Sequence, residues 1–354
     1  MKAGAVTPGQ KDSARVMEMV DPTPREGEAL VKILEAGIDG TDIEISQGHY
    51  GEPPIGQDFL VLGHEALGEV ERNGGPDLCD GDLVAPLVRR PDGCINCSSG
   101  QSDMCIEGNY RECGIVGAHG FLRQYVTEEP RFLVRVPQNL RQVAVLTEPM
   151  SIVTKGLTQS IEFHRRSANP IQVALVLGAG SLGLLSTAFL RLQGFNTYAL
   201  DIVPKSSLKG QLIEATGATY LDGRDLHINE LPRQLGNLDL VVEATGNSTV
   251  AFQAMAALGV NGVLCLMGVS TGEKRLQICA DCLNMEMVLG NRVVFGTVSS
   301  NRGHFERAIL LLAEIEKRWS GWLAQLITRR LALVDFVDAL QPALDGIKTV
   351  VAVC

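Results

Sequence analysis

Residues 171–193 read IQVALVLGAGSLGLLSTAFLRLQ, and this stretch decides the fold. Its apolar start predicts a buried strand, and residues 182–193 have the pattern of a helix. The turn between them has the GxGxxG arrangement, in which glycines let the backbone approach a pyrophosphate and the helix N-terminus offers unpaired N–H groups. A tight turn that binds nothing is the alternative. We predict that a dinucleotide binds at Gly178, Gly180, Ser181, Leu182 and Gly183.

The same stretch raises the possibility of a membrane span. Residues 173–190 carry no charge and are long enough to cross a bilayer. Three glycines and two serines in this window favour a buried strand, turn and helix instead. The net charge of −10 argues against nucleic acid and against an anionic membrane as partners. No signal peptide is evident at the N-terminus, so we expect a cytoplasmic protein.

The nature of the dinucleotide depends on Asp201, which ends the second predicted strand of this region. A carboxylate there can accept hydrogen bonds from ribose hydroxyls and repel a 2′-phosphate, which favours NAD over NADP. Lys205 and Lys209 lie nearby and would soften this discrimination, so NADP stays possible. A solvated turn carboxylate is the alternative interpretation of Asp201.

Two domains are expected from 354 residues. The first 150 residues contain short apolar runs separated by Gly and Pro, which is typical of a mainly β domain. From about Asn169, strands and helices alternate, which predicts a doubly wound parallel sheet and an α/β fold class. We assign residues 156–298 to this nucleotide-binding domain, and residues 1–155 with 299–354 to the other domain. Residues 88–118 form a Cys-rich lobe within it.

Five of the nine cysteines lie between residues 79 and 113 of this long chain, which favours metal binding in a reducing compartment over a disulfide framework. Four thiolates would make a closed structural zinc site, and free surface thiols are the alternative. The predicted ligands are Cys94, Cys97, Cys105 and Cys113, with Glu112 as a rival to the last. The remaining cysteines are interpreted as structural thiols: Cys79, Cys265, Cys354 and the pair Cys279 and Cys282.

A second metal site is predicted around Gly63-His64-Glu65, which follows an apolar run. Asp39 lies upstream and Glu148 lies at the expected junction of the domains. One imidazole with carboxylates leaves a coordination position open, as a catalytic zinc requires. A His-Glu pair is more often structural, and the accompanying motifs are what favour the metal.

The chain resembles the zinc-containing medium-chain alcohol dehydrogenases over its whole length, and within them the archaeal-type glucose 1-dehydrogenases. The matching segments are residues 37–42 (GIDGTD), 59–66 (FLVLGHEA), 86–91 (PLVRRP), 114–121 (GIVGAHGF), 146–149 (LTEP) and 304–305 (HF). The resemblance implies a GroES-like catalytic domain beside a Rossmann domain. It implies a catalytic zinc on Asp39 and His64, with Glu65 and Glu148 in or near the coordination sphere.

The same resemblance implies further roles. Thr41 would contact substrate and a proton relay, Glu65 or Glu148 would act as base, and His49 is a weaker relay candidate. Glu112, Glu148 and His304 would contact sugar hydroxyls, although a salt bridge in the lobe or a helix N-terminus would also explain Glu112 and His304. Arg89 and Arg90 have no assigned role, and a solvated pair or a pair that braces the lobe is the ordinary interpretation. The lobe departs from the family, because Pro91 stands at the usual first cysteine.

The leading hypothesis is an NAD(P)-dependent zinc enzyme that oxidises glucose or galactose at C1 to the lactone. A polyol or secondary-alcohol dehydrogenase of the same fold is the alternative. A non-catalytic nucleotide-binding or redox-sensing protein is the hypothesis from another class. The family implies a homodimer or homotetramer, and the sequence does not select between them.

Overall fold

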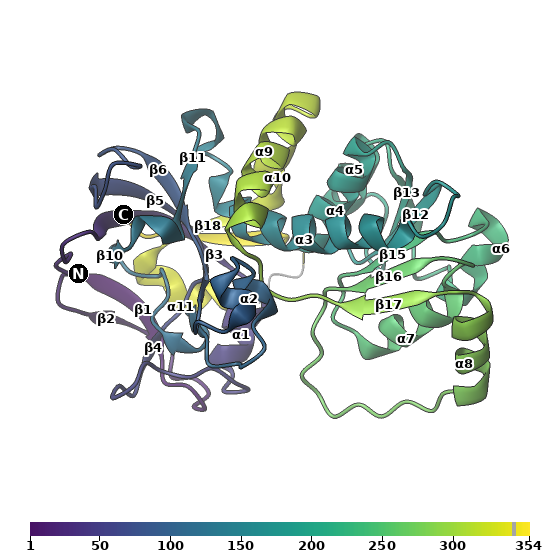
Figure 1. The fold of residues 1–354 in the computed structure, drawn as a ribbon, viewed down its shortest axis with the longest axis horizontal. Helices are drawn as coiled ribbons and strands as arrows, with labels where there is room; N and C mark the ends of the chain where they lie inside the picture. Colours follow the sequence, from purple (N-terminus) through teal and green to yellow (C-terminus); the bar gives the residue numbers. More distant parts are fainter. Residues whose placement is uncertain (342–344) are drawn as a thin grey trace. The chain divides into compact units, whose positions relative to one another are not determined.

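The computed structural model describes residues 1–341 and 345–354, which form two compact units (Figure 1). The first unit contains Met1–Ser151, Ser299–Glu316 and Leu323–Cys354. The second contains Ile152–Val298 and Lys317–Trp322. Within the described residues, no helix is both long enough and apolar enough to cross a membrane. The apolar window at residues 173–190 is divided between a strand and a helix, as predicted.

The first unit is mainly β. Its largest sheet has the order β11-β6-β5-β3-β19-β18, with β10 pairing β3. The strands are β3 (Ala29–Ile38), β5 (Glu65–Arg72), β6 (Leu83–Pro86), β10 (Tyr125–Glu128), β11 (Leu133–Val136), β18 (Ile327–Ala332) and β19 (Lys348–Ala352). The C-terminal strand β19 therefore lies beside β3, which is more than 300 residues away in sequence.

Smaller elements complete this unit. A three-stranded sheet is formed by β1 (Lys2–Val6), β2 (Arg15–Glu18) and β4 (Leu60–Val61), and another by β7 (Arg89–Arg90), β8 (Arg111–Cys113) and β9 (Gly117–Ala118). The helices are α1 (Gly40–Ser46), α2 (Ile95–Ser98), α11 (Phe336–Ala339), most of α9 (Arg302–Arg318) and most of α10 (Trp322–Leu326). Alternate residues of β3 are buried among the apolar side chains of β1, β4 and β5, which form one core.

The second unit is a six-stranded sheet of order β14-β13-β12-β15-β16-β17, parallel throughout. Its strands are β12 (Val173–Leu177), β13 (Asn196–Asp201), β14 (Thr219–Asp222), β15 (Leu240–Glu243), β16 (Val263–Leu266) and β17 (Val293–Gly296). Its helices are α4 (Ser181–Leu192), α5 (Leu208–Ala215), α6 (Leu231–Leu235), α7 (Ser248–Ala257) and α8 (Ala280–Leu289). The order reverses at β12, so the predicted doubly wound sheet is confirmed.

One long helix was absent from the sequence prediction. Helix α3 (Thr147–His164) begins in the first unit, where Glu148 lies in its first turn, and continues into the second. Pro149 is compatible with this helix because the first turn needs no intrahelical N–H bond. Gly156 lies in a tightly packed place, since a Cβ there would lie 2.4 Å from the terminal methyl group of Met267 and 3.1 Å from Cys265 Sγ.

Candidate active site and metal sites

Asp39, His64 and Glu65 lie together in the first unit, where each offers a ligand atom within 4.8 Å of the others. Asp39 is the N-cap of α1, and its Oδ1 accepts hydrogen bonds from the backbone N–H groups of Thr41 and Asp42 at 2.7 and 3.2 Å. This cap fixes the carboxylate, so that Oδ2 lies 3.5 Å from Nε2 of His64. The chain thereby brings together three of the four residues predicted for a catalytic metal.

A buried carboxylate stands on the other side of His64. Asp42 Oδ2 lies 3.8 Å from His64 Nδ1, and Asp42 Oδ1 accepts from the backbone N–H of Gly63 at 3.0 Å. Burial lowers the pKa of His64, but the charges of Asp39 and Asp42 outweigh it and raise that pKa well above its ordinary value. The site therefore attracts positive charge. A divalent cation, which replaces a proton at such sites, fits this donor set of nitrogen and oxygen atoms.

Glu65 begins β5 and is paired with a lysine that the sequence analysis missed. Lys348 Nζ lies 2.7 Å from both Oε1 and Oε2 of Glu65 and 3.3 Å from the carbonyl oxygen of Ile38. Both side chains are buried. Burial lowers the pKa of Lys348, but the charges of Glu65 and Asp39 more than compensate, so the ammonium is retained.

Glu148 is buried nearby but is not a member of the group formed by Asp39, His64 and Glu65. Burial raises the pKa of Glu148 to about 8, with His64 opposing the shift and Glu65 and Asp39 adding to it. Such a carboxyl can hold and release a proton near neutral pH.

Thr41 lies at the start of α1, and its hydroxyl donates to Asp39 Oδ2 at 3.3 Å. Burial raises the pKa of the nearby Tyr50 phenol to about 12, with the charge of Asp39 adding to the shift and Thr41 opposing it. Tyr50 is partly exposed.

Glu112 and His304 belong to a polar network in the first unit. Arg89 donates to Glu112 Oε1 from Nε and from Nη2, at 3.0 and 2.9 Å, and donates to the carbonyl oxygens of Ser102 and Asp103. His304 Nδ1 lies 4.0 Å from Oδ2 of the buried Asp103, and Asn301 donates to Oδ1 of the same carboxylate at 2.8 Å. Arg90 pairs with Glu128 at 2.6 Å. These contacts match the bracing role considered for the two arginines.

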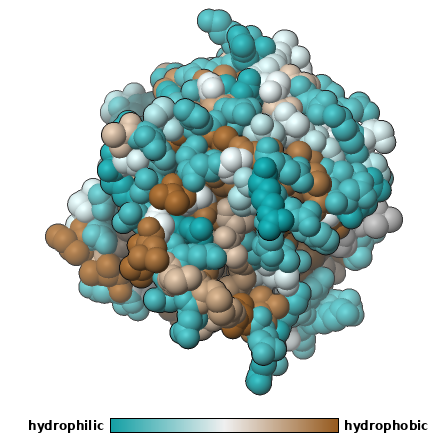
Figure 2. Space-filling model, turned by 90° about the vertical axis from the view of Figure 1, so that its right-hand side faces the viewer, coloured by the Kyte–Doolittle hydropathy of each residue, from teal (hydrophilic) through white to brown (hydrophobic). Residues whose placement is uncertain are grey.

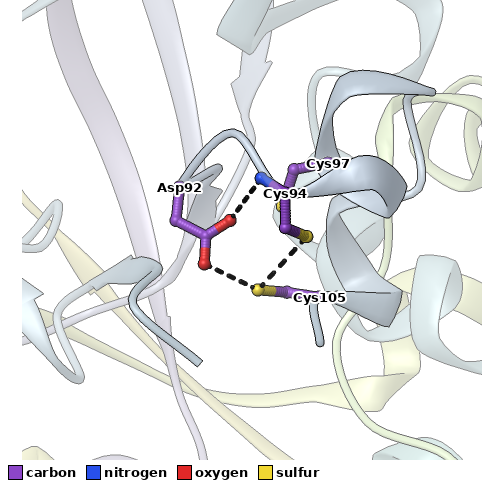
Figure 3. Close-up of side chains that lie close together, drawn as sticks. All are labelled: Asp92, Cys94, Cys97 and Cys105. Atoms are coloured by element: carbon purple, nitrogen blue, oxygen red, sulfur yellow. Dashed lines mark hydrogen bonds between the residues drawn. The ribbon is translucent and has the colours of Figure 1, made fainter. Parts of the chain in front are cut away.

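The Cys-rich lobe contains a second group of ligand atoms, and it differs from the predicted set at one position. Asp92, Cys94, Cys97 and Cys105 lie together, with all four ligand atoms within 4.8 Å of one another (Figure 3). Cys105 Sγ is 3.0 Å from Asp92 Oδ2 and 3.8 Å from Cys94 Sγ.

Cys113 was expected in this group, but it lies elsewhere. It is buried in β8 within the core of the first unit, where burial raises the pKa of its thiol. Asp92 occupies the place for which Cys113 was predicted. One carboxylate with three thiols remains a suitable zinc donor set.

The dinucleotide motif has the expected local geometry. Gly178 has a φ of +100°, and a Cβ on Gly183 would lie 1.9 Å from the Gly178 carbonyl oxygen. Gly180 is the N-cap of α4, whose first residues are Ser181 and Leu182. Asp201 ends β13 and lies against this turn, since its Oδ2 accepts from the Ala179 N–H at 2.5 Å. Its Oδ1 accepts from the Ile202 N–H at 2.6 Å.

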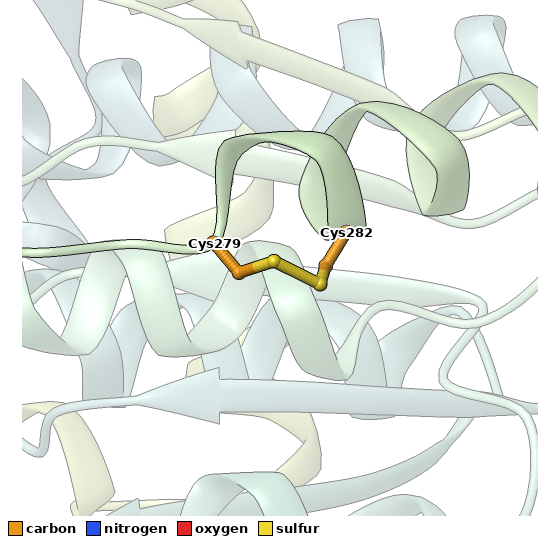
Figure 4. The surroundings of a disulfide bond; sticks show 2 residues. All are labelled: Cys279 and Cys282. Atoms are coloured by element: carbon orange, nitrogen blue, oxygen red, sulfur yellow. A yellow bond between two sulfur atoms is a disulfide. The ribbon is translucent and has the colours of Figure 1, made fainter.

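Cys279 and Cys282, interpreted from the sequence as structural thiols, form a disulfide at the start of α8 (Figure 4). The expectation failed because the helical turn brings residues three apart to the same face. The other seven cysteines are free.

Comparisons with known proteins agree with this architecture. Residues 25–138 match the alcohol dehydrogenase GroES-like domain, and residues 141–353 match the glucose dehydrogenase C-terminus. A GroES-like domain joined to a doubly wound nucleotide-binding sheet defines a medium-chain dehydrogenase. The chain is 44% identical to a glucose 1-dehydrogenase of Methanocella arvoryzae, over 100% of this chain and 99% of the relative. It is 40% identical to one of Thermoproteus tenax, with the same coverage.

Among solved structures, it matches Haloferax mediterranei glucose dehydrogenase in complex with NADP, Zn and gluconolactone, with a TM-score of 0.92 and 37% identity over 99% of both chains. The chain belongs to the glucose dehydrogenase family. The resemblance and the fold class inferred from the sequence are thereby confirmed.

Proposed function

We propose that this protein is a zinc- and NAD(P)-dependent glucose 1-dehydrogenase, which oxidises the anomeric hydroxyl of an aldose to the lactone by hydride transfer. The observation that carries the proposal is the group of Asp39, His64 and Glu65, within a chain that matches glucose 1-dehydrogenases over its full length. Galactose is the second aldose to consider.

A zinc ion would be held by Asp39 and His64, with Glu65 and Glu148 in or near its coordination sphere. The fit rests on a buried imidazole between two carboxylates, which raises its affinity for positive charge. Bound there, zinc supplies Lewis-acid polarisation of a substrate oxygen. The protein's own contribution is to orient the ligands, since α1 fixes Asp39 through its N-cap and Asp42 stands behind His64.

The substrate hydroxyl must lose a proton when its carbon loses a hydride. Glu148 is the proposed base, because it is buried near Asp39, His64 and Glu65, and burial raises its pKa to about 8 before a metal binds. Thr41 is the proposed contact to the substrate hydroxyl and the first member of a relay, supported by its hydrogen bond to Asp39. His49 stays the weaker candidate for this relay.

Glu112 and His304 are proposed to bind the remaining sugar hydroxyls. Both belong to a braced polar network, which holds their side chains in defined positions before a sugar arrives. An unpaired buried hydroxyl costs about 1–3 kcal/mol, so a sugar site needs several such partners. A polyol dehydrogenase would use the same zinc chemistry with a different arrangement of these groups, and it remains the alternative.

A structural zinc is proposed in the lobe, on Asp92, Cys94, Cys97 and Cys105. NAD is proposed as the preferred dinucleotide, because the Asp201 carboxylate lies against the glycine turn where an adenosine ribose is expected. The Haloferax relative was solved with NADP, and Lys205 and Lys209 leave NADP as a second cofactor.

We further propose a homodimer or homotetramer in the cytoplasm. Helix α8 buries none of its side chains, and Met285, Val288 and Leu289 are exposed on it. Hydrophobic side chains gather on the face that Figure 2 shows. Strand β17, which follows α8 in the chain, is an edge strand of its sheet among the described residues. Seven of the nine cysteines are free, which supports a reducing compartment, whereas the disulfide between Cys279 and Cys282 does not.

Initial rates with NAD and NADP on glucose, galactose, xylose, sorbitol and simple alcohols, before and after chelation, test the proposal. Aldose-dependent cofactor reduction that chelation abolishes is the expected result. Faster turnover of sorbitol than of any aldose would select the polyol dehydrogenase. Turnover unaffected by His64→Ala would reject the zinc chemistry, and no turnover on any of these substrates would favour a non-catalytic role.

A further inference from the structure

Lys348 is a buried cation that neither the sequence motifs nor the proposed chemistry accounts for. It begins β19 and is 2% exposed, and Glu65, which begins β5, is 1% exposed. Its Nζ contacts both oxygens of Glu65 at 2.7 Å. A lysine is this deeply buried only when it is paired. The partner here is one of the three residues gathered for the metal.

The position of Glu65 is set by three adjacent strands. Gly37 of β3 pairs with Glu65 of β5 and with Val350 of β19. A Cβ on Gly37 would lie 2.0 Å from Glu65 Oε2, so the glycine leaves the space that this oxygen occupies. Lys348 Nζ also donates a hydrogen bond to the carbonyl oxygen of Ile38, the residue after Gly37 in β3, at 3.3 Å. The fold therefore provides both the space and the cation that fix this carboxylate.

Glu65 nevertheless lies within reach of the metal group, since one of its oxygens is within 4.8 Å of the ligand atoms of Asp39 and His64. A carboxylate whose two oxygens both face an ammonium group has less electron density to give to a second cation. Four carboxylates lie around His64, and the positive charge of Lys348 compensates for the negative charge of one of them. The four are Asp39, Asp42, Glu65 and Glu148.

We propose that Lys348 is a positioning residue that holds Glu65 out of the metal's coordination sphere in the resting enzyme. One coordination position is thereby left open for the substrate, and the metal stays exchangeable. Loss of Lys348 would release Glu65 to ligate the metal and close that position. This inference rests on the proposed function for the identity of the metal site, but not for the identity of the sugar.

The test compares Lys348→Met with Lys348→Arg, Glu65→Gln and the double variant. The first readout is the rate at which zinc passes to a coloured chelator. The second is the visible spectrum of the cobalt(II)-substituted protein, from which the spectrum of His64→Ala is subtracted to remove the lobe site. Neither readout requires sugar or turnover.

Lys348→Met is expected to release zinc about 10-fold more slowly, on the scale of other changes next to metal ligands, and to weaken the cobalt bands as coordination rises. Lys348→Arg should restore both values, because it keeps the cation. In the Glu65→Gln background, Lys348→Met should change neither. A Lys348→Met protein with an unchanged cobalt spectrum, or with faster zinc release, would overturn the proposal.

If Lys348→Met does not fold, Glu65→Gln alone tests whether Glu65 is a ligand of the metal in the resting enzyme. The proposal expects this variant to keep the cobalt spectrum of the wild type, since Glu65 is not a resting ligand. A changed spectrum would overturn it. If the metal binds as described but no aldose is oxidised, the proposed function fails. The zinc release rate and the cobalt spectrum would still test the role of Lys348. If His64→Ala leaves the wild-type metal spectrum unchanged, both fail.

Discussion

Oδ2 of Asp42 lies 3.8 Å from Nδ1 of His64, while Oδ2 of Asp39 lies 3.5 Å from Nε2 on the other side of the ring. The imidazole therefore stands between two carboxylates that belong to the same helix start. Asp42 is fully buried and also accepts the N–H groups of Gly63 and Asp39. The Asp42 carboxylate makes no hydrogen bond to Nδ1, but its negative charge on that side of the ring favours the orientation in which Nε2 faces Asp39.

Asp42→Asn should weaken zinc binding at this site by about 10- to 100-fold, because an amide supports the imidazole less well than a carboxylate does. Competition with a chelator of known affinity measures the change. Asp58→Asn, the same change at an exposed position, serves as the control. Equal zinc affinity in the two variants would contradict the role given to Asp42.

Asp92→Ala should remove the metal of the lobe, because the carboxylate completes the group of three thiols. Cys113→Ala should keep that metal, because Cys113 is buried in the core away from the group. Zinc content per chain, measured by native mass spectrometry, separates the two. Loss of zinc in Cys113→Ala but not in Asp92→Ala would restore the ligand set expected from the sequence.

Asp201→Gly should relax the preference for NAD by about tenfold, a change that corresponds to about 1.4 kcal/mol. The variant removes a carboxylate that accepts the Ala179 N–H and that would repel a 2′-phosphate. The measurement is the ratio of kcat/KM values for NAD and NADP. Asp225→Asn, at an exposed position beyond β14, is the control, and an unchanged ratio in Asp201→Gly would exclude Asp201 from cofactor selection.

Acid should destabilise the protein through His119. Burial, with Arg123 adding to it, lowers the pKa of His119 to about 4 from an ordinary 6.5. The ring Nδ1 accepts the N–H of Val61, so protonation would break this bond. Because the unfolded chain binds a proton that the folded chain excludes, stability falls as pH drops from 6.5 toward 4.

In His119→Gln, the free energy of unfolding should fall less between neutral and mildly acidic pH than in the wild type. The difference should be on the order of 1 kcal/mol, after allowance for the partial exposure of the ring. Urea unfolding at neutral and mildly acidic pH measures it. His227→Gln removes an exposed histidine instead and should leave the slope unchanged. Parallel slopes for wild type and His119→Gln would contradict the prediction.

Local sequence patterns predicted the second unit well, because its strands are apolar runs and its helices follow them along the chain in a regular alternation. The strand before Gly178 and the helix after it are examples. Helix α3 was missed because Pro149 and Gly156 resemble breaks in a helix, although both are accommodated by their positions.

The candidate site was predicted only in part, since its contacts join distant segments. Lys348 and Glu65 are 283 residues apart, and no local pattern connects them. Asp92 was overlooked because the four cysteines already made a complete ligand set, and the one carboxylate considered as a rival was Glu112. The carboxylate of Asp92, two residues before Cys94, was the available signal.

The two ligand groups also differ in their susceptibility to oxidants. Asp39, His64 and Glu65 contain no sulfur, whereas three of the four donors in the lobe are thiols. Peroxide converts thiolates to sulfenic and higher acids but leaves carboxylate and imidazole donors largely untouched under the same conditions. Of the two ligand groups, damage of this kind would therefore affect the one in the lobe and spare the donors of the reaction centre, so that loss of catalysis would follow loss of structure instead of preceding it.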